Sequence, residues 1–138
     1  DLTDYISIIG LDESTKLCVQ SSTGTLIVGR WRDLYIQNLV FDYTFPGTYP
    51  RSSIISVSGK LWANRCSFYT NHNGIQVIGN GSAILNKCYF LESTQAIVLK
   101  ASAKELKVVG CVFKYCMSAI AIHSSSKTVA GFECDGNI

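Results

Sequence analysis

The sequence predicts an all-β fold, a right-handed parallel β-helix that forms a single-stranded solenoid of about six turns of roughly 22 residues. A block that ends in Cys-x-Phe recurs with its cysteines at Cys66, Cys88 and Cys111, so that the two intervals are nearly equal. A second apolar block recurs in phase with the first. Both blocks alternate apolar and polar residues as strands do, and neither shows the period of a helix.

The elements before the central repeats fit the same pattern with less regular spacing. Residues 5–29 contain three short apolar runs and are interpreted as one early turn. Residues 34–41 align with residues 61–68, and an insertion around residues 45–50, which holds both prolines, makes this step longer than the central ones. Polar or Gly-rich segments separate the short β-branched runs, which favours strands and turns over helices.

The central repeats each contain two or three short strands. Residues 61–68, 83–90 and 106–113 form the first series, and residues 74–77, 96–99 and 119–122 form the second. A step of this length is typical of one turn of a parallel β-solenoid, which buries its apolar sides only by stacking on its neighbours. A leucine-rich repeat has a similar period, but its L-x-x-L-x-L consensus is absent.

The last turn is predicted to follow a step slightly shorter than the central ones. In this alignment Val129 takes the place of Val108, and Phe132 and Cys134 take those of Cys111 and Phe113. Residues 1–138 are expected to form a single β-helix domain. Because solenoids carry atypical polar caps and neither end of this sequence has one, we expect a fragment of a longer chain.

Composition limits the classes of partner. The chain is 47% hydrophobic and 16% charged, which indicates a folded domain with a buried core. Its 12 basic and 10 acidic residues form no polybasic run, so neither nucleic acid nor a membrane surface is expected as a partner. The apolar runs are also too short to span a bilayer.

The cysteines do not show a metal-binding pattern. Cys66, Cys88 and Cys111 share one column of the repeat, so their strands are expected about 4.8 Å apart, a spacing that also allows a disulfide. A buried, reduced column is the favoured interpretation, since free cysteine packs as a small hydrophobic residue. The sequence has no C-x-x-C spacing and only two histidines, so no metal and no cofactor are expected.

The acidic residues give no catalytic arrangement. A β-helix that cleaves polysaccharides needs two or three carboxylates on one strand face, to bind calcium or to act as acid and base. Here they are scattered, and Glu133 and Asp135, which can share a face, lie near the C-terminus. His72 and His123 are expected to be exposed turn residues. We therefore expect no catalytic residues and no enzymatic activity.

Outward positions form two apolar rows. If Ala63, Leu85 and Val108 face the interior, their chain neighbours face outward, and so do the neighbours of the Cys and Phe columns. The candidate contact residues are Tyr35, Trp62 and Ile84 in one row and Val40, Tyr89 and Val112 in the other. Apolar rows of this length mark contact surfaces, although single exposed hydrophobic residues are also common. Because the rows run along the solenoid axis, we expect identical copies to associate laterally as a trimer.

Residues 110–120, Gly-Cys-Val-Phe-Lys-Tyr-Cys-Met-Ser-Ala-Ile, together with residues 66–69, Cys-Ser-Phe-Tyr, resemble a known family. The family contains the adenoviral early-region-1B large protein and the capsid-surface knob protein of the atadenoviruses. The similarity covers about residues 33–137. It implies either a trimeric, non-enzymatic β-helix that stabilises the virion surface, or a regulator that binds host proteins. The corresponding locations are the virion surface and the host nucleus during assembly.

Two other functions stay open. The insertion at residues 45–51 is longer than in that family, and the G-I-x-V steps are also similar to those of the metazoan Shc-binding spindle protein, which implies a cytoplasmic adaptor or spindle-associated scaffold. Phage tailspikes share the architecture more loosely. Because aromatic rows also stack on sugar rings, Trp62 and Tyr89 fit a β-helix that binds or cleaves polysaccharides. The expected partners are thus copies of the chain, other capsid proteins, host proteins or a glycan.

Overall fold

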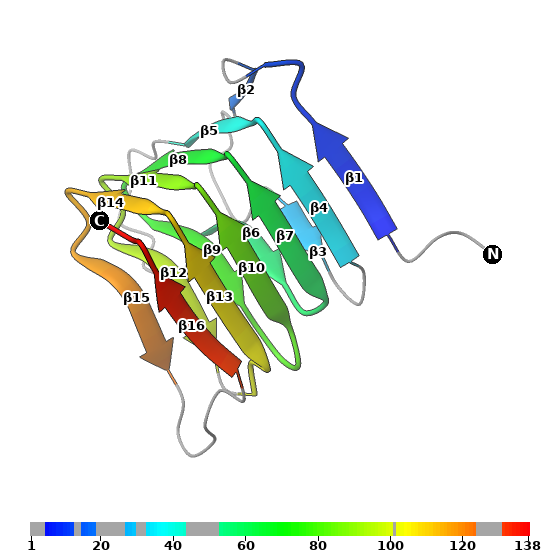
Figure 1. Cartoon of the computed structure of the whole chain (residues 1–138), viewed down its shortest axis with the longest axis vertical. Coiled ribbons are helices and arrows are strands. Elements are labelled where there is room, and N and C mark those ends of the chain that lie inside the picture. Colours follow the sequence, from blue (N-terminus) through cyan, green and yellow to red (C-terminus); the bar gives the residue numbers. More distant parts are fainter. Residues whose placement is uncertain are drawn as a thin grey trace.

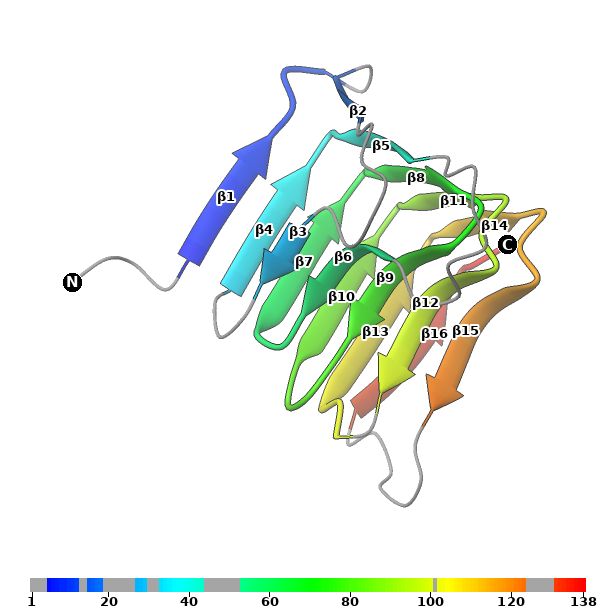
Figure 2. The same ribbon diagram turned by 180° about the vertical axis from the view of Figure 1, so that it is seen from behind.

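The computed structural model describes residues 5–12, 15–18, 27–29, 33–43, 53–100, 102–123 and 131–138. Within these ranges every regular element is a β-strand, and there are sixteen of them. The strands form three parallel sheets, each built from every third strand of the chain (Figures 1 and 2). The all-β solenoid predicted from the repeat is therefore confirmed.

The sheets are named here A, B and C in the order in which the chain visits them. Sheet A contains β1 (Tyr5–Ile9), β4 (Asp33–Gln37), β7 (Lys60–Asn64), β10 (Ser82–Asn86), β13 (Glu105–Val109) and β16 (Gly131–Asp135). Sheet B contains β2 (Lys16–Cys18), β5 (Val40–Tyr43), β8 (Ser67–Thr70), β11 (Tyr89–Leu91) and β14 (Val112–Lys114). Sheet C contains β3 (Ile27–Gly29), β6 (Ser53–Val57), β9 (Asn73–Val77), β12 (Gln95–Lys100) and β15 (Ser118–His123).

The described strands make five three-stranded turns and the first strand of a sixth. The prediction of about six turns is therefore slightly high, because only β16 represents the sixth turn. The central steps have the predicted lengths, since Leu61 pairs with Ala83 and Ala83 pairs with Leu106. The longer step before the central repeats is also confirmed, by the pairing of Leu34 with Leu61.

The last turn has a different register from the one predicted. Phe132 pairs with Leu106 and Cys134 pairs with Val108, whereas the sequence alignment placed them opposite Cys111 and Phe113. The alignment failed because the sequence offers two equivalent places. Leu106 and Val108 are inward positions separated by one residue, and so are Cys111 and Phe113. An apolar pair such as Phe132 and Cys134 fits either place. Val129 lies outside the described residues.

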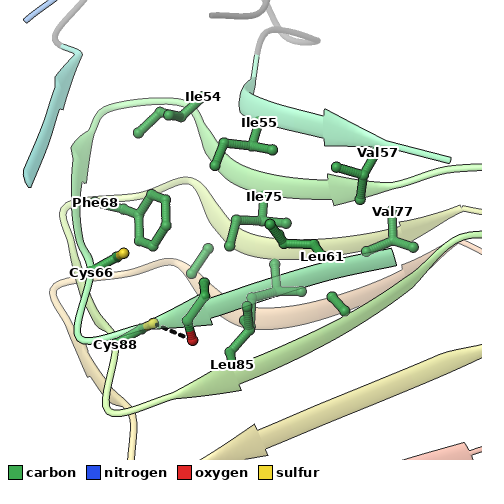
Figure 3. Packing of buried hydrophobic residues seen from close by; sticks show 14 of the residues in the cluster. Ile54, Ile55, Val57, Leu61, Cys66, Phe68, Ile75, Val77, Leu85 and Cys88 are labelled. Atoms are coloured by element: carbon green, nitrogen blue, oxygen red, sulfur yellow. Dashed lines mark hydrogen bonds between the residues drawn. The ribbon is translucent and has the colours of Figure 1, made fainter. Parts of the chain in front are cut away.

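The core is built from columns of identical or similar side chains, because consecutive turns stack in register. Phe41, Phe68, Phe90 and Phe113 stack with ring centroids 4.8–5.1 Å apart and planes within 11° of parallel. Figure 3 shows Phe68 beside Ile55 and Ile75, which pair across sheet C. The first three rings are fully buried. Each ring removed from water stabilises the fold by about 1.5–3 kcal/mol.

Four links from sheet A to sheet B, and the residue that follows β16, share one kind of backbone conformation. The residue after β4, β7, β10, β13 and β16 has φ between 52° and 61°; these residues are Asn38, Arg65, Lys87, Gly110 and Gly136. One left-handed residue reverses the side-chain alternation, so that the next residue, such as Cys66 or Cys88, points into the core. The corners also hydrogen-bond to one another, as Arg65 N–H donates to the Asn86 carbonyl.

Replacing Gly110 with alanine is expected to lower the free energy of unfolding by about 1 kcal/mol, because an L-residue is disfavoured at positive φ. A Cβ at this position would lie 3.6 Å from Lys87 Cγ, an ordinary contact, so conformational cost is the main effect. Urea denaturation measures the change, and Lys87→Gly at the equivalent corner is the control. Equal stability of Gly110→Ala and the unmodified chain would contradict the prediction.

Candidate interaction surface on sheets A and B

The cysteine column lies inside the corner between sheets A and B. Cys66, Cys88 and Cys111 are at most 1% exposed and their thiols are free. The Cys88 thiol donates to the Ala63 carbonyl at 3.5 Å, and the Cys88 N–H donates to Cys111 Sγ at 3.4 Å. Figure 3 shows the thiols of Cys66 and Cys88 one above the other. The predicted stacking of these residues is confirmed.

Two of these thiols, Cys66 and Cys88, are weaker acids than an ordinary cysteine, whereas the hydrogen bond with Cys88 lowers the pKa of Cys111. Burial raises the pKa of Cys66 to about 11, against an ordinary value of 9.0. The pKa of Cys88 is raised by its interaction with the Cys111 thiol and by burial. Because the thiolate is the reactive form, Cys66 and Cys88 are poor nucleophiles and poor metal ligands at neutral pH. The column is a packing element of the core.

The acidic and histidine side chains are dispersed. In the part of the chain that the structure describes, no three His, Cys, Asp or Glu side chains gather as metal ligands would. Glu133 pairs with Lys107 at 2.9 Å, Asp135 is exposed, and His123 is exposed at the end of β15. His72 was expected to be exposed, but it is only 9% exposed. The reason is that its link between sheets B and C packs against the next turn, where Thr94 N–H donates to the His72 carbonyl.

The outer face of sheet A carries the first predicted row. Tyr35 pairs with Trp62, and Trp62 pairs with Ile84, so the three side chains occupy consecutive strands of one column. All three are partly exposed. The Lys60 ammonium lies 4.8 Å from the Trp62 ring centroid, which is cation–π distance, and the Tyr35 hydroxyl donates to Gln37 Oε1. These contacts hold both aromatic side chains on the surface.

The same column continues beyond the apolar residues in both directions. Ser7 of β1 precedes Tyr35, and Lys107 and Glu133 follow Ile84. The term sheet A row is used here for Tyr35, Trp62 and Ile84 only. It is an apolar strip bounded by polar and charged residues, which is the usual arrangement of a small interface.

The second predicted row lies on the outer face of sheet B and is shorter than expected. Val40, Ser67, Tyr89 and Val112 share one column, and Tyr89 and Val112 are partly exposed. Val40 is only 7% exposed, so it adds little to the exposed apolar surface of this row. Its neighbours in the column are Lys16 of β2 and Ser67 of β8.

Two residues of the sheet B surface were missed. Tyr69 and Leu91 pair with one another in the adjacent outward column and are partly exposed. The Tyr69 and Tyr89 rings meet edge to face with centroids 6.1 Å apart. The signal was present in the sequence, since each residue follows a recognised outward position by two. The term sheet B patch is used here for Tyr69, Tyr89, Leu91 and Val112.

The predicted contact residues therefore form two surfaces. The sheet A row and the sheet B patch lie on different sheets, and the corner between them carries the exposed side chains of Arg65 and Lys87.

Among the described residues there is no helix long and apolar enough to cross a membrane.

Comparison with known families identifies the fold. A family model described as the right-handed β-helix region matches residues 14–137. The chain belongs to the right-handed β-helix family. The handedness predicted from the repeat is thus confirmed, and the resemblance noted above is supported at the level of a β-helix, without reaching the adenoviral protein family. Neither a curated protein nor a solved structure matches the chain.

As a right-handed β-helix, the molecule presents flat sheet faces whose columns run along the solenoid axis (Figure 1). Family membership alone does not decide activity, because right-handed β-helices include both enzymes and proteins without enzymatic activity. The arrangement on the described faces offers apolar strips with charged borders. Such strips can bury apolar area against another flat surface, so they are suited to binding.

Proposed function

We propose that this right-handed β-helix is a non-enzymatic structural protein that works by lateral association of identical copies through the outer face of sheet A. The observation that carries the proposal is the stacking of Tyr35, Trp62 and Ile84 on three consecutive strands. The three side chains together span about 10 Å along the solenoid axis.

Aromatic residues at the centre of a contact supply most of its binding energy, and a polar border excludes water from it. Trp62 is the middle residue of the sheet A row. Lys60 and Asn64 flank it on its own strand, and Tyr35 and Ile84 lie on the strands on either side. A rigid sheet also loses little conformational entropy on binding, because its side chains are already ordered by their neighbours.

The resemblance of residues 110–120 to the adenoviral proteins supports a more specific form of this proposal. In that form the chain is a trimer on the virion surface that stabilises the capsid by contact with other capsid proteins. It would be present in the host nucleus during assembly. Stacked parallel turns suit this role, because every turn is held by hydrogen bonds and side-chain columns on both sides.

The proposal predicts that Trp62→Asp weakens self-association. Sedimentation velocity over a concentration series is expected to show assembly of the unmodified chain, and the substitution is expected to raise the dissociation constant at least about tenfold, because it places a carboxylate in the apolar strip. His123→Asp, at an exposed position on sheet C, is the matched control and is expected to leave assembly unchanged. A monomer over the whole concentration range would contradict the proposed function.

A polysaccharide-binding role is the second candidate, and one observation favours it. Tyr69 and Tyr89 lie on adjacent strands of the sheet B patch with their rings in edge-to-face contact. Partly exposed aromatic rings at this spacing also suit stacking on sugar rings. A glycan array separates the two candidates: specific binding that Tyr89→Ala abolishes and Trp62→Asp leaves intact would favour the glycan.

A further inference from the structure

The outer face of sheet A has a charge pattern that complements itself. Its outward residues form three columns, which contain Asp33, Lys60, Ser82 and Glu105; Ser7, Tyr35, Trp62, Ile84, Lys107 and Glu133; and Ile9, Gln37, Asn64, Asn86, Val109 and Asp135. The basic residues lie on β7 and β13, and the acidic residues lie on β4, β13 and β16. The face is therefore not symmetric from one end to the other, which makes the direction of pairing decisive.

We propose that two copies pair face to face through sheet A in antiparallel directions, about a two-fold axis that runs along β10. This inference rests on the proposed self-association and specifies its geometry. An axis along β10 places β10 opposite itself and β7 opposite β13 of the other copy. Each column then faces the same column, with its order reversed.

This register brings complementary groups together. Lys60 of one copy faces Glu105 of the other, so an ammonium meets a carboxylate twice in the dimer. Trp62 faces Lys107, which is a cation–aromatic contact. Ile84 of one copy faces Ile84 of the other at the centre of the contact, where an apolar side chain is removed from water most completely.

The outer strands of the face also match. β4 lies opposite β16, so the Tyr35 hydroxyl faces the Glu133 carboxylate and the Gln37 amide faces the Asp135 carboxylate. Asn64 faces Val109, which is a polar-to-apolar pair. Lys87 lies near its own copy at the corner beyond the face, where its exposed side chain is screened by solvent and salt.

Other antiparallel registers bring like charges together. An axis along β7 places Lys60 opposite Lys60. An axis along β13 places Glu105 opposite Glu105 and Lys107 opposite Lys107. An axis between β7 and β10 places Asp33 opposite Glu105. Like charges held face to face in an interface oppose association, so these registers are disfavoured.

Two further arrangements place charges badly. An axis between β10 and β13 puts Ile84 opposite Lys107 and Trp62 opposite Glu133, so that charges are desolvated against apolar groups. A parallel pair about an axis along the solenoid places Lys107 opposite Lys107 and Glu133 opposite Glu133. An axis between β4 and β7 also pairs opposite charges, Asp33 with Lys60, but it leaves β13 and β16 outside the contact. The axis along β10 keeps opposite charges together and places all five strands from β4 to β16 against the other copy.

A two-fold pair also needs less surface than a trimer. A two-fold interface uses one self-complementary patch, whereas a cyclic trimer needs two different patches on each copy. The face measures about 24 Å by 17 Å, or about 400 Å² per copy, which is small for a stable complex. We therefore expect a weak dimer with a dissociation constant in the micromolar range or above.

A charge exchange tests this register. Lys60→Glu and Glu105→Lys are each expected to raise the dimer dissociation constant about tenfold, because each creates two like-charge contacts. The double variant Lys60→Glu/Glu105→Lys is expected to restore the dissociation constant of the unmodified chain. Sedimentation velocity of the whole chain at several concentrations, in low and moderate salt, measures the assembly, and circular dichroism verifies that each variant is folded. Lys114→Glu, at an exposed position on sheet B, is the control.

The outcomes separate this inference from the proposed function. A dimer that each single variant weakens and the double variant restores supports both. A dimer that the double variant fails to restore overturns the axis along β10, and so does a trimer, but both results preserve self-association through sheet A if Trp62→Asp weakens the assembly. A monomer at every concentration overturns both.

Discussion

Phe90→Ala is expected to lower the free energy of unfolding by about 3–5 kcal/mol, the largest effect of any single substitution considered for this chain. Phe90 is fully buried and stacks between Phe68 and Phe113, with ring centroids 4.8 and 5.1 Å away. Removing it deletes two ring contacts and leaves a cavity in the middle of the column. The loss includes both the transfer of the ring to water and the cavity.

The surroundings of Phe90 offer little that can fill this cavity. On sheet C the nearest backbone is that of Gly74, where a Cβ would lie 3.1 Å from the Phe90 ring and 2.5 Å from the Ala96 carbonyl oxygen. Gly74 has no side chain to move into the space, and the two neighbouring rings are held by their own strands. We therefore expect the loss to lie toward the upper part of the range.

Tyr89→Ala is the matched control for this prediction. Tyr89 is the preceding residue of the same strand but points outward and is partly exposed, so its removal is expected to cost less than about 1 kcal/mol. Urea denaturation followed by circular dichroism measures both variants. If Phe90→Ala and Tyr89→Ala lowered stability equally, the assignment of inward and outward positions in sheet B would be wrong.

The sequence was sufficient to predict the fold because the repeat fixes the register. A nearly constant step between Cys66, Cys88 and Cys111 requires that each strand pair with its equivalent in the next turn, and alternation then assigns each side chain to the core or the surface. For this reason Tyr35, Trp62 and Ile84 were placed correctly in one column. These properties depend on local spacing, which a sequence contains.

Exposure is a different property, and alternation does not determine it. Val40 points outward but is covered, and His72 lies in a link but is buried, because neighbouring turns cover both. How far a neighbour covers a side chain depends on distances between strands that are remote in sequence. Predictions of exposure from a repeat are therefore most reliable for large side chains such as Trp62, which extend beyond their neighbours.

The last turn shows why the candidate site needed the structure. The register predicted from the sequence would place Glu133 in the column of Val112 on sheet B, but the observed register places it beside Lys107 on sheet A. With the observed register, the acidic residues of β16 lie on the outer face of sheet A, four strands away from Asp33 on β4. In the proposed dimer only the contacts of Glu133 and Asp135 depend on this step, because Lys60 and Glu105 lie on central strands whose register the sequence predicts.

The second large effect is a loss of stability at alkaline pH that depends on the thiol of Cys66. Burial raises the pKa of Cys66 to about 11, whereas the ordinary value of 9.0 applies when the chain is unfolded. The folded state therefore retains the proton at a pH where the unfolded state releases it. The stabilising contribution is complete below about pH 9 and is lost as the pH rises to about 11.

The size of this contribution follows from the difference in pKa. Each pH unit between the two values favours the unfolded state by about 1.4 kcal/mol, so the change is about 3 kcal/mol in total. The cause is the desolvation of the thiolate, since the side chain is 1% exposed in the corner between Leu39 and Cys88. Backbone hydrogen bonds with Leu39 and Asn64 lower the pKa of Cys66 but do not reverse the effect of burial.

Denaturation by urea between pH 8 and pH 11, with a non-thiol reductant present, measures the effect as a difference between two chains. The unmodified chain is expected to lose about 2 kcal/mol more than Cys66→Ala over this range, because the folded-state thiol is half ionised at pH 11 and every other titratable group is present in both chains. Cys134→Ala, which removes an exposed thiol, is the control and is expected to change the pH dependence much less. Identical pH dependence in the unmodified chain and Cys66→Ala would mean that water reaches the thiol. The cysteine column would then be accessible to solvent, and the three sheets could not share one core from which water is excluded.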